Sequence, residues 1–245
     1  MDLGHQHEAV ANRILRALPE ETLHRLWPAL DRVETVNGQV VGHVDELVEY
    51  VYFINRGLAS VIKTLQDGRT VEIGAVGVEG VTDCVNLFGI GTAFVESVIQ
   101  VPGTAFRIRR EVLQQEIDAD AALREMMHLY VRFAFAEIAQ TAACNRLHSI
   151  EKRCSRWLLV AHDNALSDTF PLTHEFLAMM LGTQRAGVTI AASALRRAGL
   201  IAYRRGRITV TDRLGLETAS CECYATMQAE LLKLFGKEPS RHPRH

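Results

Sequence analysis

The chain has 245 residues, of which 48% are hydrophobic and 23% are charged, and its formal net charge is −2. This balance is typical of a soluble globular protein and shows no signature of disorder. No apolar run reaches the roughly 18 residues that a membrane helix needs, so we expect no membrane partner. The N-terminus lacks the basic start and apolar core of a secretory signal, which predicts a cytoplasmic protein.

The first part of the chain changes from helical to β-rich patterning. Residues 8–31 predict short helices, because their apolar residues recur mostly at three- and four-residue steps. From Val33 onward, short β-rich runs alternate with turn signals, which predicts a compact all-β roll or barrel. Asp67-Gly68 predicts a hairpin with positive φ at both central residues. The predicted strand separators are Asn37-Gly38, Arg56-Gly57, Asp67-Gly68, Gly89/Gly91 and Pro102-Gly103.

A long helix is predicted next, since residues 121–147 contain neither proline nor glycine. The period becomes helical after Arg109, and apolar residues then occupy two faces of the helix. One face can cover the β-domain, and we expect the other to pack on the same helix of a second chain. The alternative is one thick helix inside a single core. The first stripe contains Met126, Leu129, Phe133, Ala136, Ala143 and Leu147, and the second contains Val131, Phe135, Ile138 and Ala142.

A helix is predicted over 151–163, and a helix-turn-helix follows it. Thr173 is a candidate N-cap for the first helix, and Gly182 supplies the left-handed residue that ends it. The second helix is predicted from Thr183 or Gln184 to Ala198-Gly199. Such a pair can place its second helix in the major groove of DNA. Residues 201–210 then predict two strands around Arg205-Gly206, which would form the wing of a winged helix-turn-helix.

The charge of residues 184–213 differs from that of the rest of the chain. Seven arginines stand against one acid, Asp212, so the segment carries 7 − 1 = +6. A basic segment in a slightly acidic chain predicts a surface that binds a polyanion. The arginines are Arg185, Arg196, Arg197, Arg204, Arg205, Arg207 and Arg213.

Two kinds of DNA contact are expected from this motif. Base edges should meet the exposed polar residues of the second helix, because arginine pairs with guanine and glutamine with adenine through two hydrogen bonds. Phosphates should meet residues that position the protein without specifying sequence. The expected base-facing residues are Gln184, Arg185 and Thr189, and the expected phosphate contacts are Thr173, His174, Arg204 and Arg205.

The cysteines predict neither disulfides nor a metal site. There are five, an odd number, and they are widely scattered along the chain. Cys221-Glu222-Cys223 is a C-x-C pair, but a zinc site would want a second pair at ligand spacing, and the sequence shows none. We therefore expect ordinary thiols. The cysteines are Cys84, Cys144, Cys154, Cys221 and Cys223.

On these residues the chain resembles the CRP/FNR family of bacterial transcription regulators over nearly its whole length. Residues 172–190, LTHEFLAMMLGTQRAGVTI, are similar to the family's DNA-binding motif without gaps, including the initial Thr, the Gly of the turn and the Arg two residues after Thr183. The resemblance implies an α+β fold with three parts. These are an N-terminal sensory β-roll (double-stranded β-helix or jelly-roll-like) over 1–120, a dimerisation helix over 121–147 and a winged helix-turn-helix domain over 148–245.

The resemblance also implies partners. It implies a homodimer on a near-palindromic double-stranded DNA site, with Arg185 as the principal base reader and RNA polymerase as the protein partner. Where the family continues with an acidic and then a basic residue, this chain has Ala186 and Ile190. The half-site consensus of better-known members therefore does not carry over.

The sensory loop departs from the family pattern. In cyclic-nucleotide-binding members a Gly-Glu pair holds the ribose and a following arginine neutralises the phosphate. Here residues 77–83 occupy that place, and Glu79 or Asp83 would stand in for the acid. No Arg or Lys occurs from Thr70 to Phe106. Burying a phosphate monoanion without a charged partner is costly, so we expect no cAMP or cGMP binding of the usual kind.

The positions of the cysteines and histidines also bear on other cofactors and functions. No cysteine precedes Cys84, which argues against an FNR-type iron–sulfur cluster. A haem held by His43 or Cys84 would be an alternative to an ordinary side chain. A cupin-like metalloenzyme would need several histidines on the barrel, yet His43 is the single one between Val33 and Arg109. Another alternative is a protein-binding module that no longer recognises DNA, but the presence of Arg185 and of the predicted wing argues against it. We therefore expect no catalytic residues.

Overall fold

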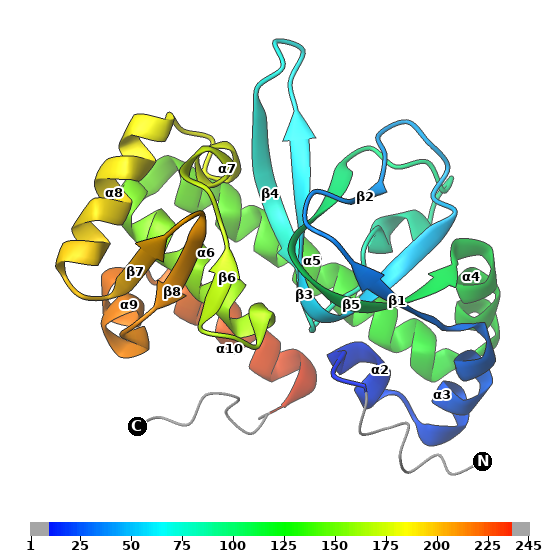
Figure 1. Cartoon of the computed structure of the whole chain (residues 1–245). Helices are drawn as coiled ribbons and strands as arrows, with labels where there is room; N and C mark the ends of the chain where they lie inside the picture. The colour runs from blue at the N-terminus through cyan, green and yellow to red at the C-terminus, as the bar shows by residue number, and fades with distance from the viewer. Residues whose placement is uncertain (1–9, 237–245) are drawn as a thin grey trace. The chain divides into compact units, whose positions relative to one another are not determined.

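The computed structural model describes residues 10–236 of the chain (Figure 1). Its contacts divide the chain into two compact units, which are described separately. Among the described residues, the N-terminal unit comprises 10–61 and 75–135, and the C-terminal unit comprises 62–74 and 136–236. The predicted α+β class is confirmed, with a sheet in the N-terminal part of the chain and a helix-turn-helix in the C-terminal part. None of the helices in the described residues is long and apolar enough to cross a membrane.

A five-stranded sheet occupies the N-terminal part of the chain. Its order is β1-β5-β3-β4, with β2 paired to β5, and β1 runs antiparallel to β5. Buried aliphatic side chains from β3, β4 and β5 form a core cluster, which includes Ile54, Ala59 and Ile99. The elements in this part of the chain are α2 (Arg13–Ala17), α3 (Glu20–Leu26), η1 (Trp27–Ala29), β1 (Asp31–Thr35), β2 (Val40–Gly42), β3 (Tyr50–Thr64), β4 (Thr70–Val76), η2 (Cys84–Leu87), β5 (Glu96–Arg109), α4 (Arg110–Ala119) and α5 (Ala121–Leu147).

Two of the predicted strand separators are wrong. Arg56-Gly57 lies within β3 and Pro102-Gly103 lies within β5, so neither pair ends a strand. The physical reason is a close approach of the two backbones. A Cβ at Gly57, whose φ is +100°, would collide with the carbonyl oxygen of Val101, and a Cβ at Gly103 would collide with that of Arg56. The two glycines therefore permit the strands to meet rather than to turn.

The predicted hairpin at Asp67-Gly68 is confirmed, but its turn differs from the expectation. β3 and β4 are neighbours in the sheet, and Leu65 N donates to Arg69 O at 2.8 Å. Of the two residues, Gly68 alone has positive φ, at +82°. Asp67 instead accepts a hydrogen bond from Arg69 N at 3.1 Å, a local bond that a short turn favours.

The long helix α5 has the predicted bounds, and its buried seam includes Phe133 of the first predicted stripe but otherwise lies one step away from the predicted stripes. Leu123, Met127 and Tyr130 are almost fully buried, whereas Leu129 is 40% and Leu147 is 75% exposed. The Tyr130 hydroxyl occupies the space where Gly80 would carry a Cβ. This face of α5 thus packs closely on the loop of residues 77–83.

The C-terminal unit combines helices with a three-stranded sheet. The sheet has the order β6-β8-β7, and both pairs are antiparallel. The sequence patterning did not predict β6, which has only three residues and ends in proline. The elements are α6 (Ile150–Ala165), β6 (Thr169–Pro171), α7 (His174–Met180), α8 (Arg185–Arg197), β7 (Ile201–Arg204), β8 (Arg207–Val210), α9 (Arg213–Ala219) and α10 (Cys223–Phe235).

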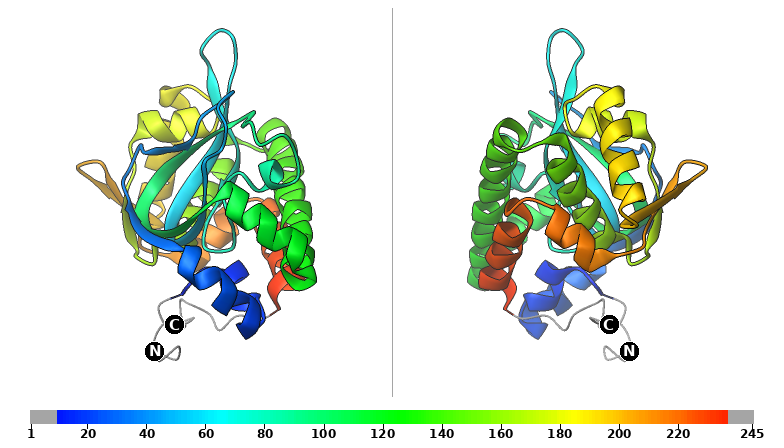
Figure 2. Two further views of the ribbon diagram at one scale, coloured as in Figure 1. Left: turned by 90° about the vertical axis from the view of Figure 1, so that its right-hand side faces the viewer. Right: turned by 90° about the vertical axis from the view of Figure 1, so that its left-hand side faces the viewer.

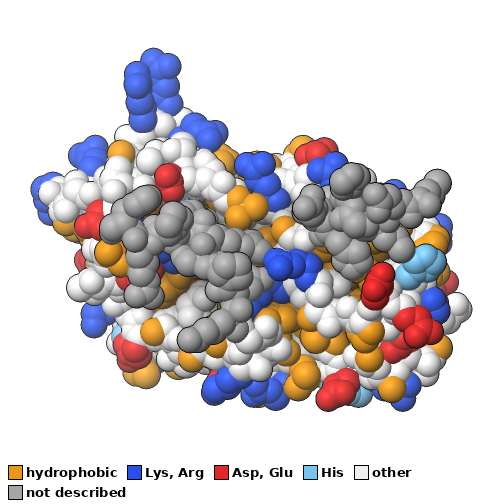
Figure 3. All heavy atoms as spheres, turned by 90° about the horizontal axis from the view of Figure 1, so that it is seen from below, with side chains coloured by type: hydrophobic (Ala, Val, Ile, Leu, Met, Phe, Trp, Pro, Cys, Tyr) orange, Lys and Arg blue, Asp and Glu red, His pale blue; other side chains and the backbone are white. Residues whose placement is uncertain are grey.

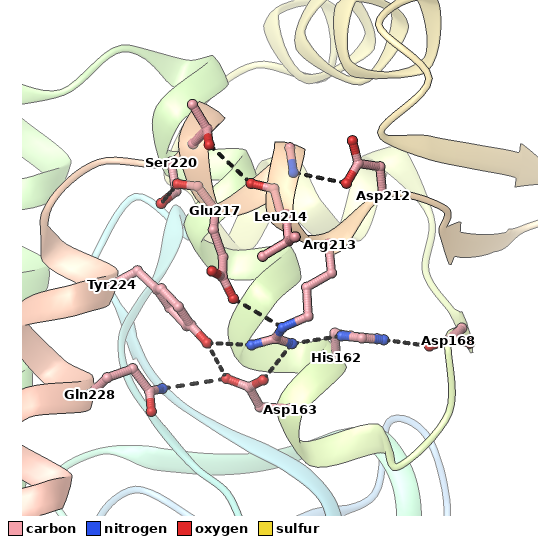
Figure 4. A network of polar contacts seen from close by, with 12 residues as sticks. His162, Asp163, Asp168, Asp212, Arg213, Leu214, Glu217, Ser220, Tyr224 and Gln228 are labelled. Atoms are coloured by element: carbon pink, nitrogen blue, oxygen red, sulfur yellow. Dashed lines mark hydrogen bonds and ion pairs between the residues drawn. The ribbon is translucent and has the colours of Figure 1, made fainter. Parts of the chain in front are cut away.

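Arg213 joins three helices of this unit through one polar network (Figure 4). Its guanidinium pairs with Asp163 of α6 at 2.7 Å and with Glu217 of α9 at 3.0 Å. It also donates to the hydroxyl of Tyr224 on α10 at 2.6 Å. Tyr224 in turn donates to Asp163 at 2.8 Å. The network therefore fixes the helical frame on which the helix-turn-helix is built.

Candidate nucleic-acid interface

The turn between α7 and α8 is built from the residues that the sequence singles out. Thr173 caps α7, since its hydroxyl oxygen accepts a hydrogen bond from Phe176 N at 3.1 Å. Gly182 has φ of +55°, and Thr183 N donates to Ala178 O at 2.9 Å. The chain then enters α8 with Gln184 as its N-cap residue. The geometry is that of a helix-turn-helix.

Helix α8 has a buried face and an exposed face. Val188, Ala191, Ala192 and Leu195 are buried, and Gln184, Arg185 and Thr189 lie on the exposed side. Arg185 is the first residue of α8, where the helix dipole disfavours a positive side chain. An exposed cation at that end therefore contributes little to helix stability, which favours a role in binding an anion or a base edge.

Gly187 on this helix has a structural reason. A Cβ at Gly187 would lie 2.9 Å from Cδ1 of Ile150, the first residue of α6. The glycine costs α8 about 1 kcal/mol of helix propensity relative to alanine. The absence of a side chain at Gly187 allows the start of α6 and the start of α8 to pack closely.

His174 is held inside the motif. Its Nδ1 lies 3.2 Å from the hydroxyl of Thr189, and its ring centroid lies 4.7 Å from that of Tyr203 on β7. The Thr189 hydroxyl also donates to Arg185 O at 2.9 Å. Burial, together with the charges of Arg185 and Arg196, lowers the pKa of His174. His174 thus ties α7 to α8 and the wing, and its neutral form is favoured. The proposed roles of His174 and Thr189 at DNA remain predictions.

The wing is a tight hairpin between β7 and β8. Arg205 and Gly206 form its two-residue loop, and both have positive φ, +51° and +74°. This is the backbone of a type I′ turn. The loop places Arg204 and Arg205 in exposed positions. The hairpin projects from the helices of its own unit (Figure 2).

The basic segment is smaller than its sequence suggests. Arg213 is engaged in the network of Figure 4 with a 24% exposed side chain, so it belongs to the structural frame. The other six arginines are not drawn into this network, and all six are exposed. On the face drawn in Figure 3, basic, acidic and hydrophobic side chains are mixed, apart from a projection that ends in basic side chains.

Two residues of the motif escaped the sequence reasoning. Ile190 is 65% exposed on α8, and Tyr203 supports His174 from the wing. An isoleucine where the resembled family has a basic residue is a signal that the sequence could have offered, since apolar groups contact the thymine methyl group. Tyr203 carried no such signal, because its role depends on the fold of the wing against α7.

The two predicted effector residues have separate environments. The Glu79 carboxylate accepts a hydrogen bond from Gly77 N at 2.7 Å, within its own loop. Asp83 is 7% exposed, has φ of +54°, and lies against Gly42, while its Oδ2 has no hydrogen-bond partner among the described residues. Burial raises the pKa of the Asp83 carboxyl to about 6. The role of both carboxylates in an effector pocket remains a prediction.

Asp83→Asn is expected to stabilise the protein at pH 7 by up to about 3 kcal/mol. A carboxyl whose pKa is raised by folding stabilises the fold at low pH, and this contribution is lost as the pH rises from about 4 to about 6. Asparagine tolerates the left-handed backbone and keeps the acceptor for Asn86. Urea unfolding of both proteins at about pH 4 and about pH 7 measures the difference, which should vanish at the lower pH.

Asp45→Asn is the matched control, because Asp45 also has positive φ, +64°, but is exposed. It should change stability little at either pH. A pH-independent effect of Asp83→Asn, or a loss of stability at neutral pH, would contradict the assignment.

Comparison with known proteins agrees with this geometry. Residues 152–219 match the Crp-like helix-turn-helix domain family, a span that includes α7, α8 and the wing. A search of curated protein sequences found no significant match. Similar folds occur among solved structures at low sequence identity.

The match spans nearly the whole chain of three such structures. FixK2 from Bradyrhizobium japonicum has a TM-score of 0.65 at 16% identity, covering 78% of this chain and 98% of its own. TTHB099, a CRP-family transcriptional regulator from Thermus thermophilus, has a TM-score of 0.62 at 21% identity. The match covers 78% of this chain and 96% of TTHB099. The c-di-GMP-responsive global regulator CLP from Xanthomonas campestris has a TM-score of 0.60 at 18% identity. The match covers 78% of this chain and 99% of CLP. Residues 152–219 therefore match a Crp-like helix-turn-helix domain, and the chain shares its fold with these three structures.

Proposed function

We propose that the protein binds double-stranded DNA sequence-specifically, with α8 in the major groove and the wing on the phosphate backbone. The observation that carries the proposal is the exposed Arg185 at the first residue of α8. Arg185 reads guanine, and Ile190 and Ala186 offer apolar contacts to thymine methyl groups. Arg204 and Arg205 contact phosphates. Gln184, Thr189, Thr173 and His174 complete the surface, with His174 acting chiefly through its contacts to Thr189 and Tyr203.

The protein acts as a homodimer through α5 in this proposal. Phe135 and Ile138, both on the second apolar stripe, are 74% and 39% exposed in the single chain. A second copy of the same helix would cover them and bring two recognition helices to one DNA site. Two-fold symmetry then implies inverted half-sites about one helical turn apart. RNA polymerase is the proposed protein partner, and the proposed location is the cytoplasm, where a bacterial regulator meets its DNA.

The sensory unit responds to something other than cAMP or cGMP bound in the usual way. Residues 70–106 contain no Arg or Lys, and Asp83 is already buried against Gly42. A cyclic phosphate placed there would meet a carboxylate and no cation from this segment. Both effects oppose binding, since a buried anion needs a charged or strongly hydrogen-bonding partner.

A DNA titration across salt concentrations tests the proposed function. We expect the logarithm of the association constant to fall linearly with the logarithm of salt, with a slope of about −0.9 for each phosphate contacted. A protein-binding module that has lost DNA reading would show no retention on DNA at low salt. A flat salt response would also contradict the proposal. Fluorescence anisotropy of labelled genomic fragments measures both quantities.

A further inference from the structure

The expectation that Cys221 and Cys223 lack a second ligand pair is wrong. Cys144 and His148 supply that pair from the C-terminal end of α5, and all four ligand atoms lie within 4.8 Å of one another. Cys144 and His148 are four residues apart, and His148 N donates to Cys144 O at 3.1 Å. The helical turn therefore continues to His148 and places both side chains on one face.

The distances suit one tetrahedral ion. Cys144 Sγ lies 3.5 Å from Cys221 Sγ, and Cys223 Sγ lies 3.5 Å from His148 Nδ1. Zinc bonds of about 2.3 Å to sulfur and about 2.0 Å to nitrogen imply ligand-to-ligand distances of roughly 3.5–3.8 Å in a tetrahedron. A disulfide, by contrast, needs sulfur atoms about 2.0 Å apart. The ligands of an iron–sulfur cluster bind different irons, so they spread farther than those of a single ion.

The surroundings of the four residues are those of a metal site. His148 directs Nδ1 at the thiols, and its Nε2 lies 3.2 Å from a carboxylate oxygen of Glu222. A carboxylate on the outer nitrogen of a metal-bound histidine is the usual second partner, because it fixes the tautomer and the ring. Gln140 Nε2 donates to Cys223 Sγ at 3.0 Å. The three cysteines are at most 3% exposed, which leaves no open position for a substrate.

Positive charge also lies beside the cluster. Arg153 and Arg156 on α6 are 8% and 6% exposed, and both interact electrostatically with Cys144. The Nε atoms of both arginines have no hydrogen-bond partner among the described residues. Three thiolates around a divalent cation carry a net charge of −1, which buried arginines can balance. If the three thiols were neutral, they would provide no negative charge to balance these two arginines.

We propose that Cys144, His148, Cys221 and Cys223 bind one structural Zn²⁺. Sulfur-rich ligands with one imidazole favour zinc, and four protein ligands in a closed site indicate a structural role. The ion fastens Cys221, in the segment between α9 and α10, and Cys223, the first residue of α10, to the last turn of α5 and the residue that follows it. This inference is independent of DNA binding, because it concerns ligands remote in sequence from the recognition helix.

Metal analysis of the purified full-length protein tests the site. After saturation with Zn²⁺ and removal of excess metal, we expect one zinc per chain, released by a thiol-specific reagent. Cys144→Ser and Cys223→Ser should each abolish retention. Cys154→Ser and Cys84→Ser should retain it, because those buried thiols lie outside the cluster. Burial raises the pKa of Cys154 to about 12, as expected of an inert thiol.

A variant that replaces one metal ligand by another separates loss of zinc binding from misfolding. His148→Cys should retain zinc as a site of four thiolates, whereas His148→Ala should bind it more weakly. Glu222→Ala should weaken zinc binding by about 10-fold. Co²⁺ in place of zinc should give the intense visible absorption of a tetrahedral thiolate site in the wild type. Absence of bound zinc in the folded wild type, an iron–sulfur spectrum, or a Cys144–Cys221 disulfide in freshly purified protein would overturn the proposal.

Discussion

Arg213→Ala is expected to lower the free energy of unfolding of the C-terminal unit by about 3 kcal/mol. The substitution removes the ion pair to Asp163 and the hydrogen bonds to Glu217 and Tyr224. The Asp163 carboxylate, with a 25% exposed side chain, would keep only Tyr224 and Gln228 as partners among the residues of this network. Leaving a partly buried charge without its counter-ion costs more than the pair contributes when intact.

Fluorescence of Trp157 gives the measurement, since the chain has only two tryptophans and Trp157 is buried in α6. Trp27→Phe in both proteins would make Trp157 the sole reporter during urea unfolding. Arg197→Ala is the matched control, because Arg197 is exposed and its loss should change stability by less than about 0.5 kcal/mol. Equal stability of the two variants would show that the network contributes nothing beyond surface charge.

Arg185→Ala is expected to weaken binding to the preferred DNA site by about 10- to 100-fold per half-site, because a bidentate contact to guanine contributes about 1–3 kcal/mol. The loss should be confined to sequences that contain the preferred base, so discrimination at one position of each half-site should disappear. Protein stability should be nearly unchanged, since Arg185 is exposed at the unfavourable end of the helix dipole.

Arg205→Ala provides the comparison. Arg205 lies in the wing loop, and its removal should weaken all sequences alike and reduce the salt slope by about 1. Alanine is strained at the positive φ of Arg205, so Arg205→Asn should accompany it to keep the hairpin intact. Identical sequence profiles for the Arg185 and Arg205 variants would refute the division between base reading and phosphate contact.

Local features of the fold were predictable from the sequence. The cap at Thr173, the turn at Gly182 and the wing around Arg205-Gly206 depend on neighbours within a few residues, and each lies where the pattern placed it. The presence of the long helix α5 was predictable, because residues 121–147 contain neither proline nor glycine and their apolar residues follow a helical period. Its buried seam did not follow, because apolar residues on several faces leave the 3.6-residue period ambiguous.

Long-range features were not predictable. Gly57 and Gly103 look like turn residues, and only the pairing of β3 with β5 reveals that each makes room for the other strand. Cys144 and Cys221 are 77 residues apart, so no spacing rule joins them. Arg213 looks like part of a DNA-binding segment, and only the packing of α6, α9 and α10 turns it inward. In each case the partner comes from another element.

Selection of binding sites from a random pool of double-stranded DNA tests the central claim most directly. The full-length wild type should enrich two inverted half-sites with centres about one helical turn apart, each containing a guanine that the Arg185→Ala variant no longer prefers. Failure to enrich any sequence, or the same sequence enriched equally by wild type and Arg185→Ala, would contradict the proposed recognition by α8.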